Sequence, residues 1–372
     1  MKNYSFNIQK LAYLLVVICL TAYVLYVGQG ILIPLVFSLF FAFMLKPICE
    51  KIETKITYRP VSILLTIILA ITPIIALITF FSLQLVEVVQ NMDSISASIE
   101  TAFNDFLGTI KSFVGISKKE SKAILDENTS EIVKAPLAYL GTTISLSSNF
   151  LINLLLTFIY TFLLLLYRTA IKKFYIIQFA TNTKEDAEEL LSRIQSVIQK
   201  YLYGLLMVIA ILGILNSIGL CIIGIEYAFF WGFLAAFLAI IPYIGTVLGG
   251  FLPFIYTFAS TDTYWQPIAV IILFALVQVI EGNLITPKVV GSSIKINPLA
   301  AIVALLVGSS IWGIAGLILA LPTIAIIRII FGQIDFLKPI NLLLSDEIYD
   351  KDDVFEERYD KEKFRLSNFF KK

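Results

Sequence analysis

The chain has 372 residues, of which 58% are hydrophobic and 15% are charged, and its mean hydropathy is +0.89. A soluble globule of this length would not bury so much apolar surface, so the composition predicts an all-α, polytopic membrane protein with the lipid bilayer as its solvent. The net charge of +1 gives no reason to expect a nucleic-acid partner, and the absence of histidine excludes histidine-based catalysis and metal ligation.

The first 86 residues predict three transmembrane helices. Residues 11–27 are uncharged and nearly long enough, at about 1.5 Å per residue, to cross about 30 Å of hydrocarbon. A glycine turn leads into a short second span, 31–45, and residues 61–86 form the third. Four basic residues lie between the second and third spans: Lys46, Lys51, Lys55 and Arg59. The positive-inside rule therefore places this connector, and with it the amino terminus, in the cytoplasm.

Residues 87–149 are much more polar and form a separate extracytoplasmic region. Apolar residues recur at steps of three and four between Met92 and Phe113, which predicts one apolar stripe on an amphipathic helix. We expect this stripe to pack on the outer face of the same protein. A partner-binding coiled coil is the alternative, although the repeat is short for one.

Residues 150–332 form the predicted transport core. Its full spans are 150–167, 201–225 and 263–280, so the chain has about six full transmembrane helices. Thr183 is a predicted N-cap for an amphipathic helix over 183–200. This helix lies on the cytoplasmic membrane surface or forms a solvated linker, and the sequence does not separate the two.

Two segments of the core, 227–261 and 296–327, carry no charge and are too long for one span and too short for two. Both contain helix breakers near the centre. We interpret them as two broken or re-entrant helical elements that enter from opposite sides, as in an inverted repeat. Two ordinary kinked spans with glycines at close helix contacts are the alternative. The remaining residues, 333–372, are predicted to be a charged, solvated cytoplasmic tail.

Glu281 is the strongest candidate for a functional side chain because it follows an apolar run. A carboxylate inside the membrane is costly when charged and unpaired, so we expect it to be protonated, paired or bound to a cation. The alternative is a carboxylate at the inner interface, hydrogen-bonded to Asn283 or a backbone amide. Pro287 and Pro298 remove backbone donors and could leave carbonyls free to coordinate a cation or a polar solute.

Small and polar residues in the same regions have more ordinary interpretations. Each glycine of the broken segments could allow a ligand to approach the backbone, but is more simply explained by helix packing. The uncharged polar groups Asn216, Gln278 and Asn283 could line a path, although hydrogen bonding between helices is the default. The three cysteines are predicted to be buried apolar residues, because they lie far apart in or beside apolar runs: Cys19, Cys49 and Cys221.

The sequence shows no enzyme constellation and no cofactor or metal motif. A GxxxxGK[ST] nucleotide loop is absent, no serine has a histidine partner, and Asp262 is isolated in a predicted loop. We therefore predict that the chain is not an enzyme, has no cofactor and is not a primary pump.

Several motifs together resemble one family. They are Pro242-Tyr243-Ile244-Gly245 with Gly249 and Pro253, Glu281-Gly282-Asn283-Leu284-Ile285-Thr286-Pro287, Gly291, Pro298, Gly313-Ile314-Ala315-Gly316, and Ala320-Leu321-Pro322. This combination is similar to the AI-2E family of bacterial permeases, and the resemblance covers most of the chain. One position departs from the family pattern, because Thr246 stands where a proline is usual.

The resemblance implies a secondary transporter of the bacterial inner membrane, with both termini cytoplasmic. It implies export of a small polar solute such as the quorum signal autoinducer-2, coupled to an ion gradient, or sodium (or lithium)/proton antiport. The family resemblance also implies a homo-oligomer, with a pentamer as the expected assembly. A membrane scaffold that transports nothing is the alternative from another functional class. The predicted pathway residues are Glu281, Asn283, Pro287, Gly291, Pro298, Pro242, Tyr243, Gly245, Gly249, Pro253, Gly313, Gly316 and Pro322.

Overall fold

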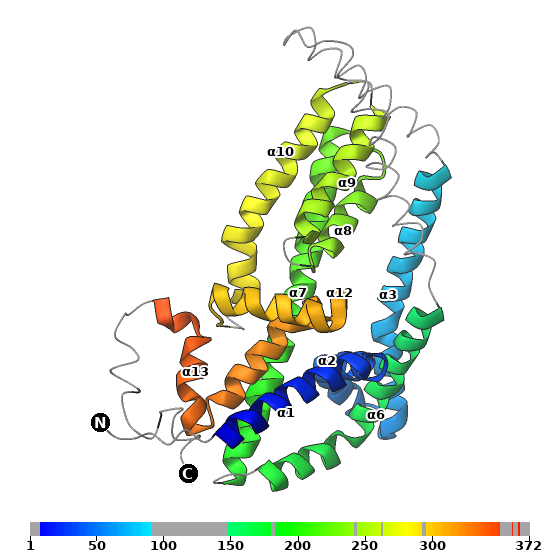
Figure 1. Cartoon of the computed structure of the whole chain (residues 1–372). Coiled ribbons are helices and arrows are strands. Elements are labelled where there is room, and N and C mark those ends of the chain that lie inside the picture. Colours follow the sequence, from blue (N-terminus) through cyan, green and yellow to red (C-terminus); the bar gives the residue numbers. More distant parts are fainter. Residues whose placement is uncertain are drawn as a thin grey trace, which may run out of the picture. The chain divides into compact units, whose positions relative to one another are not determined.

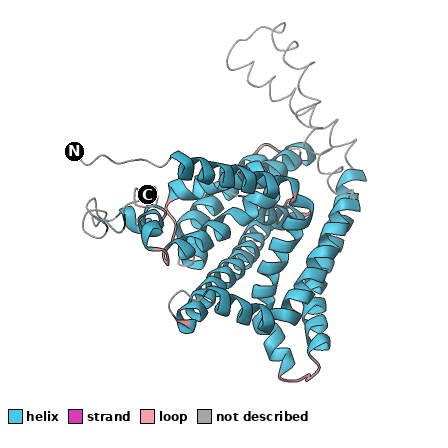
Figure 2. Cartoon of the chain, turned by 60° about the horizontal axis from the view of Figure 1, so that its bottom comes forward, coloured by secondary structure: helices cyan, strands magenta, loops and turns pink. Residues whose placement is uncertain are grey.

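The computed structural model describes residues 8–90, 148–179, 183–241, 244–261, 263–291 and 295–349, together with Tyr359 and Phe364. Within these residues the chain is built from helices joined by short loops and contains no strand (Figure 2). Seven of the described helices are long and apolar enough to cross a membrane. The prediction of an all-α, polytopic membrane protein is therefore confirmed.

Six of these seven helices correspond to the six predicted full spans. They are α1 (Ile8–Val27), α2 (Gln29–Glu53), α3 (Arg59–Gln90), α6 (Ser148–Phe179), α7 (Lys184–Ile223) and α10 (Trp265–Ile280). The seventh, α12 (Pro298–Phe331), is interrupted near its middle. Two shorter apolar helices, α8 (Ala228–Leu238) and α9 (Ile244–Ser260), cover the other predicted broken segment.

The contacts within the chain divide it into two units that are each drawn from separate stretches of sequence. Unit 1 comprises Met1–Ile68, Asn153–Leu206 and Thr286–Lys372, and unit 2 comprises Leu69–Ile152 and Met207–Ile285. The helices of unit 2 that matter for the site are the second half of α7, α8, α9 and α10, which form the green to yellow group in Figure 1.

Unit 2 has an aromatic core centred on Trp231 of α8, whose side chain is 2% exposed. The Trp231 ring lies 5.1 Å from the ring of Tyr256 in α9, measured between centroids. Helices approach closely here because a side chain at Gly232 would collide with Ser217 of α7. Glycine at such a crossing lets apolar helices pack backbone to backbone. Gly232 is therefore explained by helix packing, as the sequence analysis expects for glycines of this segment.

The break between α8 and α9 confirms that the segment 227–261 is not one helix. The Gly245 backbone N–H donates to Ile241 O over 2.9 Å, and a Cβ on Gly245 would lie 1.6 Å from Leu238 O. Only glycine can occupy that position, because any other residue would clash with the preceding helix end. Pro242 and Tyr243, at the centre of the break, lie outside the described residues.

In unit 1, α12 folds back on itself. The backbone leaves the helical region at Trp312 and at Gly313, which has a φ of 57°, and a Cβ on Gly316 would lie 1.8 Å from Gly308 O. The two arms of α12 therefore meet backbone to backbone at Gly308 and Gly316. Figure 1 shows the two arms of this helix running in different directions. The prediction of an interrupted segment over 296–327 is confirmed, and the interruption is a tight helical hairpin. Pro322 lies buried within the second arm.

Helix α7 differs from the prediction of a separate amphipathic helix over 183–200. It is a single helix of 40 residues from Lys184 to Ile223. The predicted N-cap is confirmed, because the Thr183 hydroxyl oxygen accepts a hydrogen bond from the Asp186 backbone N–H over 3.1 Å. The predicted boundary between this helix and the span over 201–225 is wrong, because α7 runs through it. The glycine close to this boundary, Gly204, costs a helix only about 1 kcal/mol relative to alanine and does not end it.

The first part of the predicted tail is also folded rather than solvated. It forms a 3₁₀ turn (Asp335–Leu337), α13 (Lys338–Leu343) and a second 3₁₀ turn (Asp346–Tyr349). Asn297 caps α12 through its side-chain oxygen and donates from Nδ2 to Leu343 O over 2.6 Å. Arg328 donates from Nη2 to Ser345 Oγ over 3.1 Å. These long-range bonds hold residues 335–349 against both ends of α12.

The end of the second span and the burial of the cysteines differ from the predictions. Helix α2 continues past Pro47 to Glu53, eight residues beyond the predicted end of the second span at 45. Cys49 is buried as predicted, whereas Cys19 and Cys221 are exposed on the surfaces of their helices. An apolar residue that faces lipid need not be buried in protein, and this explains the error. The amphipathic stripe from Met92 to Phe113 lies outside the described residues.

Candidate functional site

Unit 2 contains a pocket between α7, α8, α9 and α10. The second half of α7, α8 and the residue after it, α9, α10 and the first residue of the following π-helix each contribute to its walls. The cavity volume is about 30 Å³, which is enough for about two water molecules. The lining residues are Leu212, Asn216, Ala235, Ala239, Thr246, Gly249, Phe274, Val277, Gln278 and Glu281.

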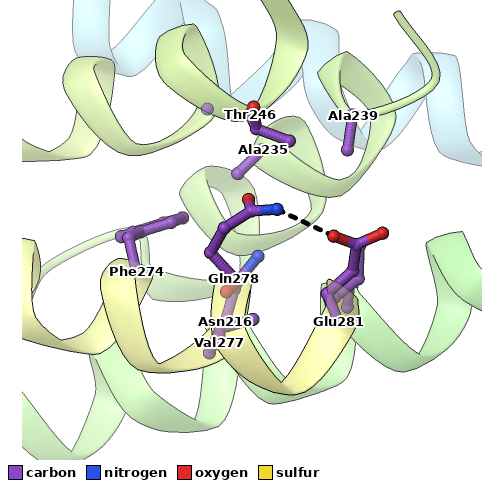
Figure 3. A pocket seen from close by; sticks show the side chains of 10 residues that line it. Asn216, Ala235, Ala239, Thr246, Phe274, Val277, Gln278 and Glu281 are labelled. Atoms are coloured by element: carbon purple, nitrogen blue, oxygen red, sulfur yellow. Dashed lines mark hydrogen bonds between the residues drawn. The ribbon is translucent and has the colours of Figure 1, made fainter. Parts of the chain in front are cut away.

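Glu281 lies where α10 changes into a π-helix. The π-helical segment η1 (Glu281–Ile285) follows α10 directly, and such wider turns are common at functional sites. The Gln278 side chain donates from Nε2 to Glu281 Oε2 over 2.8 Å, as Figure 3 shows. The carboxylate therefore accepts a hydrogen bond from a neutral amide one turn earlier, and Glu281 lines the pocket.

The opposite wall is made by the first broken segment. Ala239, the residue that ends α8, and Thr246 and Gly249 of α9 line the pocket together with Glu281 (Figure 3). A Cβ on Gly249 would lie 3.1 Å from Ala235 Cα, so this glycine lets α9 pack closely on α8. The described part of the Pro242–Pro253 region and Glu281 therefore line the same pocket.

Asn216 of α7 supplies the most deeply buried polar side chain of the pocket. It is 3% exposed, and its Oδ1 has no hydrogen-bond partner among the described residues. Helix packing is the default interpretation of Asn216 in the sequence. The sequence signal that could have identified it is a carboxamide in the apolar interior of a membrane helix, since such groups are costly without a partner.

Thr246 is the second residue that sequence reasoning did not place in the site. It stands at the departure from the family pattern, where a proline is usual, and its side chain lines the pocket. A threonine at this position adds a hydroxyl to the wall, and proline has none to offer. The departure therefore changes the chemistry of the pocket as well as the local backbone.

Asn283 has a local role in the π-helix. It is exposed, and its Nδ2 donates to Val279 O over 2.8 Å. Val279 O is the carbonyl that would accept the Asn283 backbone N–H in an α-helix, so the side chain bonds to the last α-helical turn before the π-helix.

The remaining predicted pathway residues belong to other places in the fold. Pro287 and Gly291 bound the second π-helical segment, η2, which is part of unit 1. Pro298 occupies the first turn of α12 after the Asn297 cap, where a missing N–H leaves no helical carbonyl unpaired. Gly313, Gly316 and Pro322 build the α12 hairpin. Pro253 lies within α9, and its carbonyl accepts the Thr257 hydroxyl over 2.7 Å.

The described residues contain no group of three or more His, Cys, Asp or Glu side chains that could hold a metal ion. The chemistry that the pocket offers is therefore that of one carboxylate, two carboxamides and one hydroxyl from four different elements. Such a set can bind protons, small cations or polar solutes through oxygen and amide groups.

The chain is similar in sequence to known transport proteins. The chain is 26% identical to the AI-2 transport protein TqsA of Escherichia coli over 319 residues, which cover 85% of this chain and 90% of TqsA. It is 25% identical to YueF of Bacillus subtilis over 320 residues, covering 81% of this chain and 83% of YueF. It is 33% identical to YrrI of Bacillus subtilis over 138 residues, which span only 38% of YrrI. Because residues 14–335 match the family described as AI-2E family transporter, this chain belongs to the AI-2E family of transporters.

Proposed function

We propose that this chain is a secondary transporter that exports a small polar solute in exchange for an ion, with Glu281 as the coupling group. One observation carries the proposal: Glu281 faces a pocket between the end of an apolar helix and a broken helix pair. Broken helices beside an intramembrane carboxylate are a recurrent arrangement in ion-coupled carriers. Glu281 changes charge when it gains or loses a proton, and this change would couple the ion to the solute.

The charge change has a clear physical consequence in this pocket. A neutral, protonated Glu281 can remain in an apolar surrounding, whereas an ionised Glu281 needs a donor, a cation or water beside it. Gln278 provides one donor, and the pocket has room for about two waters or one small ion. Proton binding and binding of a second ligand would therefore compete at one carboxylate.

The identity of the solute rests on the relatives. TqsA is named as an AI-2 transport protein, and this supports an autoinducer-2-like signal as the exported solute. A pocket of about 30 Å³ would have to widen to hold such a molecule, so export requires a second conformation of α8, α9 and α10. The small volume favours a second candidate, sodium (or lithium)/proton antiport, because a dehydrated cation needs no such widening.

Flux measurements with purified full-length protein in proteoliposomes test the proposal. Export predicts solute accumulation that depends on a pH gradient, and antiport predicts a pH change when sodium is added; either should be lost in Glu281→Gln. Glu226→Gln is the matched control, since Glu226 is exposed and lies between α7 and α8, away from the pocket lining. Folded protein that shows neither flux would overturn the transporter proposal and favour the scaffold alternative.

The cellular setting belongs to the same proposal. The basic residues after the second span, and those after the fourth span (Arg168, Lys172 and Lys173), support cytoplasmic termini in a bacterial inner membrane. The homo-oligomer, with a pentamer as its expected form, stays a prediction that mass measurement of the detergent-solubilised protein would check.

A further inference from the structure

Arg59, the first residue of α3, carries a charge that its own unit neutralises only in part. Arg168 of α6 donates from Nη1 to Glu53 Oε1 over 3.0 Å and from Nη2 to Glu53 Oε2, so one guanidinium engages both oxygens of that carboxylate. Arg59 Nε lies 3.8 Å from the same Glu53 Oε1, which is too far for a hydrogen bond. Two arginines therefore share one carboxylate, and positive charge is left in excess.

Arg59 also has hydrogen-bond donors to spare. Among the described residues its side chain makes one hydrogen bond, from Nη2 to Leu165 O over 2.9 Å. A guanidinium has five N–H donors in a planar fork and no acceptor, so its matching partner is an anion with two oxygens, such as a phosphate. The Arg59 side chain is 34% exposed, which leaves room for an anion from outside the chain.

The segments on either side of this contact, 46–59 and 168–173, add further positive charge. Lys46 and Lys172 form ion pairs with Glu50 and Glu188. The other lysines of these segments are exposed, and no described residue pairs with their ammonium groups: Lys51, Lys55 and Lys173. We call these three lysines and Arg59 the basic junction, because the bonds of Arg168 and Arg59 join the two segments.

The surface next to the basic junction is apolar. Helix α3 continues beyond Arg59 with apolar side chains at helical spacing that are between 39% and 51% exposed: Val61, Leu64, Leu65 and Ile68. Both α2 and α3 are long and apolar enough to cross a membrane, so the short connector between them lies near the headgroup layer. Tyr58 in this connector is 68% exposed, and tyrosine favours that depth. A ligand with an anionic head and apolar tails fits this surface.

We propose that the basic junction binds the headgroup of an anionic phospholipid from the surrounding bilayer. Arg59 contacts the phosphate through its fork, the lysines add electrostatic attraction, and the exposed side chains of α3 contact the acyl chains. Basic sites between membrane helices recognise acidic headgroups by the same chemistry. The basic junction belongs to unit 1 and shares no residue with the Glu281 pocket, so this inference does not depend on the proposed function.

Thermal unfolding of the full chain in detergent measures the binding, with phosphatidylglycerol as the probe and phosphatidylcholine of the same acyl chains as the reference. Increasing phosphatidylglycerol should raise the unfolding temperature of the wild type, because a ligand that binds only the folded state stabilises it. Phosphatidylcholine should not raise it. Arg59→Gln should weaken the apparent affinity for phosphatidylglycerol about fivefold, the effect of one basic residue at an anionic lipid surface.

Arg193→Gln is the matched control. Arg193 also belongs to unit 1, but its charge is already paired with Glu189 on an exposed helix face. Its affinity for phosphatidylglycerol should equal that of the wild type. The double variant Lys55→Gln/Lys173→Gln keeps the proposal testable if Arg59→Gln does not fold, because both lysines are exposed and pair with no described residue. It should weaken the affinity at least fivefold.

Three outcomes would overturn the lipid site. Equal shifts with phosphatidylglycerol and phosphatidylcholine would show that the headgroup charge is not recognised. Wild-type affinity in both Arg59→Gln and the double lysine variant would show that the lipid binds elsewhere. An equal shift with inorganic phosphate alone would assign the basic junction to a soluble anion. None of these measurements involves flux, so the proteoliposome experiment decides the proposed function separately.

Discussion

The Gln278 side chain donates a hydrogen bond from Nε2 to Glu281 Oε2 over 2.8 Å, one helical turn further along the chain. The donor lies in the last turn of α10 and the acceptor is the first residue of η1. Residues three apart share one face of a helix, so this bond holds the carboxylate on the face that lines the pocket. The geometry of the proposed coupling group therefore depends on a neutral neighbour.

Replacing Gln278 with leucine should impair transport more than stability. A hydrogen bond to a charged group contributes about 1.5–3 kcal/mol, and each 1.4 kcal/mol corresponds to about a tenfold change in rate. We expect the initial flux in proteoliposomes to fall about tenfold. The unfolding temperature should change little because Gln278 is exposed on its helix.

Val279→Leu is the control for this change, since Val279 neighbours Gln278 and is 61% exposed. It should transport at the wild-type rate. Equal flux in Gln278→Leu and Val279→Leu would contradict the positioning role of the amide.

Gly316→Ala should destabilise the α12 hairpin. The added Cβ would lie 1.8 Å from Gly308 O, so the two arms would have to separate. Overpacking of this kind costs about 1–3 kcal/mol, which thermal unfolding in detergent would detect. Gly30→Ala in α2 should be neutral or slightly stabilising, because nothing lies within 4 Å of a Cβ there. A Gly316→Ala protein as stable as Gly30→Ala would disprove the tight hairpin.

Glu53→Gln should destabilise unit 1 by about 3 kcal/mol, a typical loss when one partner of a largely buried ion pair is removed. Glu53 accepts from Arg168 Nη1 over 3.0 Å, and both side chains are 21% exposed. The free energy of unfolding in denaturant would measure the loss.

Glu189→Gln provides the comparison, because its pair with Arg193 is more than half exposed on both sides. Exposed pairs contribute at most about 1 kcal/mol. Similar losses in Glu53→Gln and Glu189→Gln would mean that the Glu53 pair is not specially stabilising.

Trp312→Phe should loosen the contact between α12 and α1. The indole Nε1 of Trp312 donates to Leu25 O over 2.9 Å, and phenylalanine keeps the ring but loses the donor. We expect a loss of about 1 kcal/mol in the free energy of unfolding. Trp265→Phe should leave it unchanged, since Trp265 is 56% exposed. Identical stabilities of the two variants would show that this bond does not contribute.

The membrane spans were predictable because their signal is local. A run of about 20 apolar residues has to cross the bilayer as a helix wherever it lies in the chain, so α1, α3 and α10 follow from composition alone. The two interrupted segments were predictable for the same reason, because their lengths fit neither one span nor two. The N-cap at Thr183 is equally local, since it involves only residues three positions apart.

The errors arose where distant residues decide the outcome. Residues 335–349 are polar enough to predict a solvated tail, but Asn297 and Arg328 hold them in place through bonds that no local pattern contains. The sequence predicts separate helices over 183–200 and 201–225, yet α7 continues through both. The exposure of Cys19 depends on which helix faces are left without a neighbour.

By itself, the sequence determined the solvent, the number of spans, the two interruptions and the presence of a carboxylate at the end of α10, because each depends on hydrophobicity and length. The tertiary structure decided that Asn216 and Thr246 join Glu281 in one pocket. It also decided that Gly308 meets Gly316 in a hairpin. The physical reason is that a pocket or a helix crossing depends on which faces of separate helices meet, and hydropathy along one chain does not record those pairings.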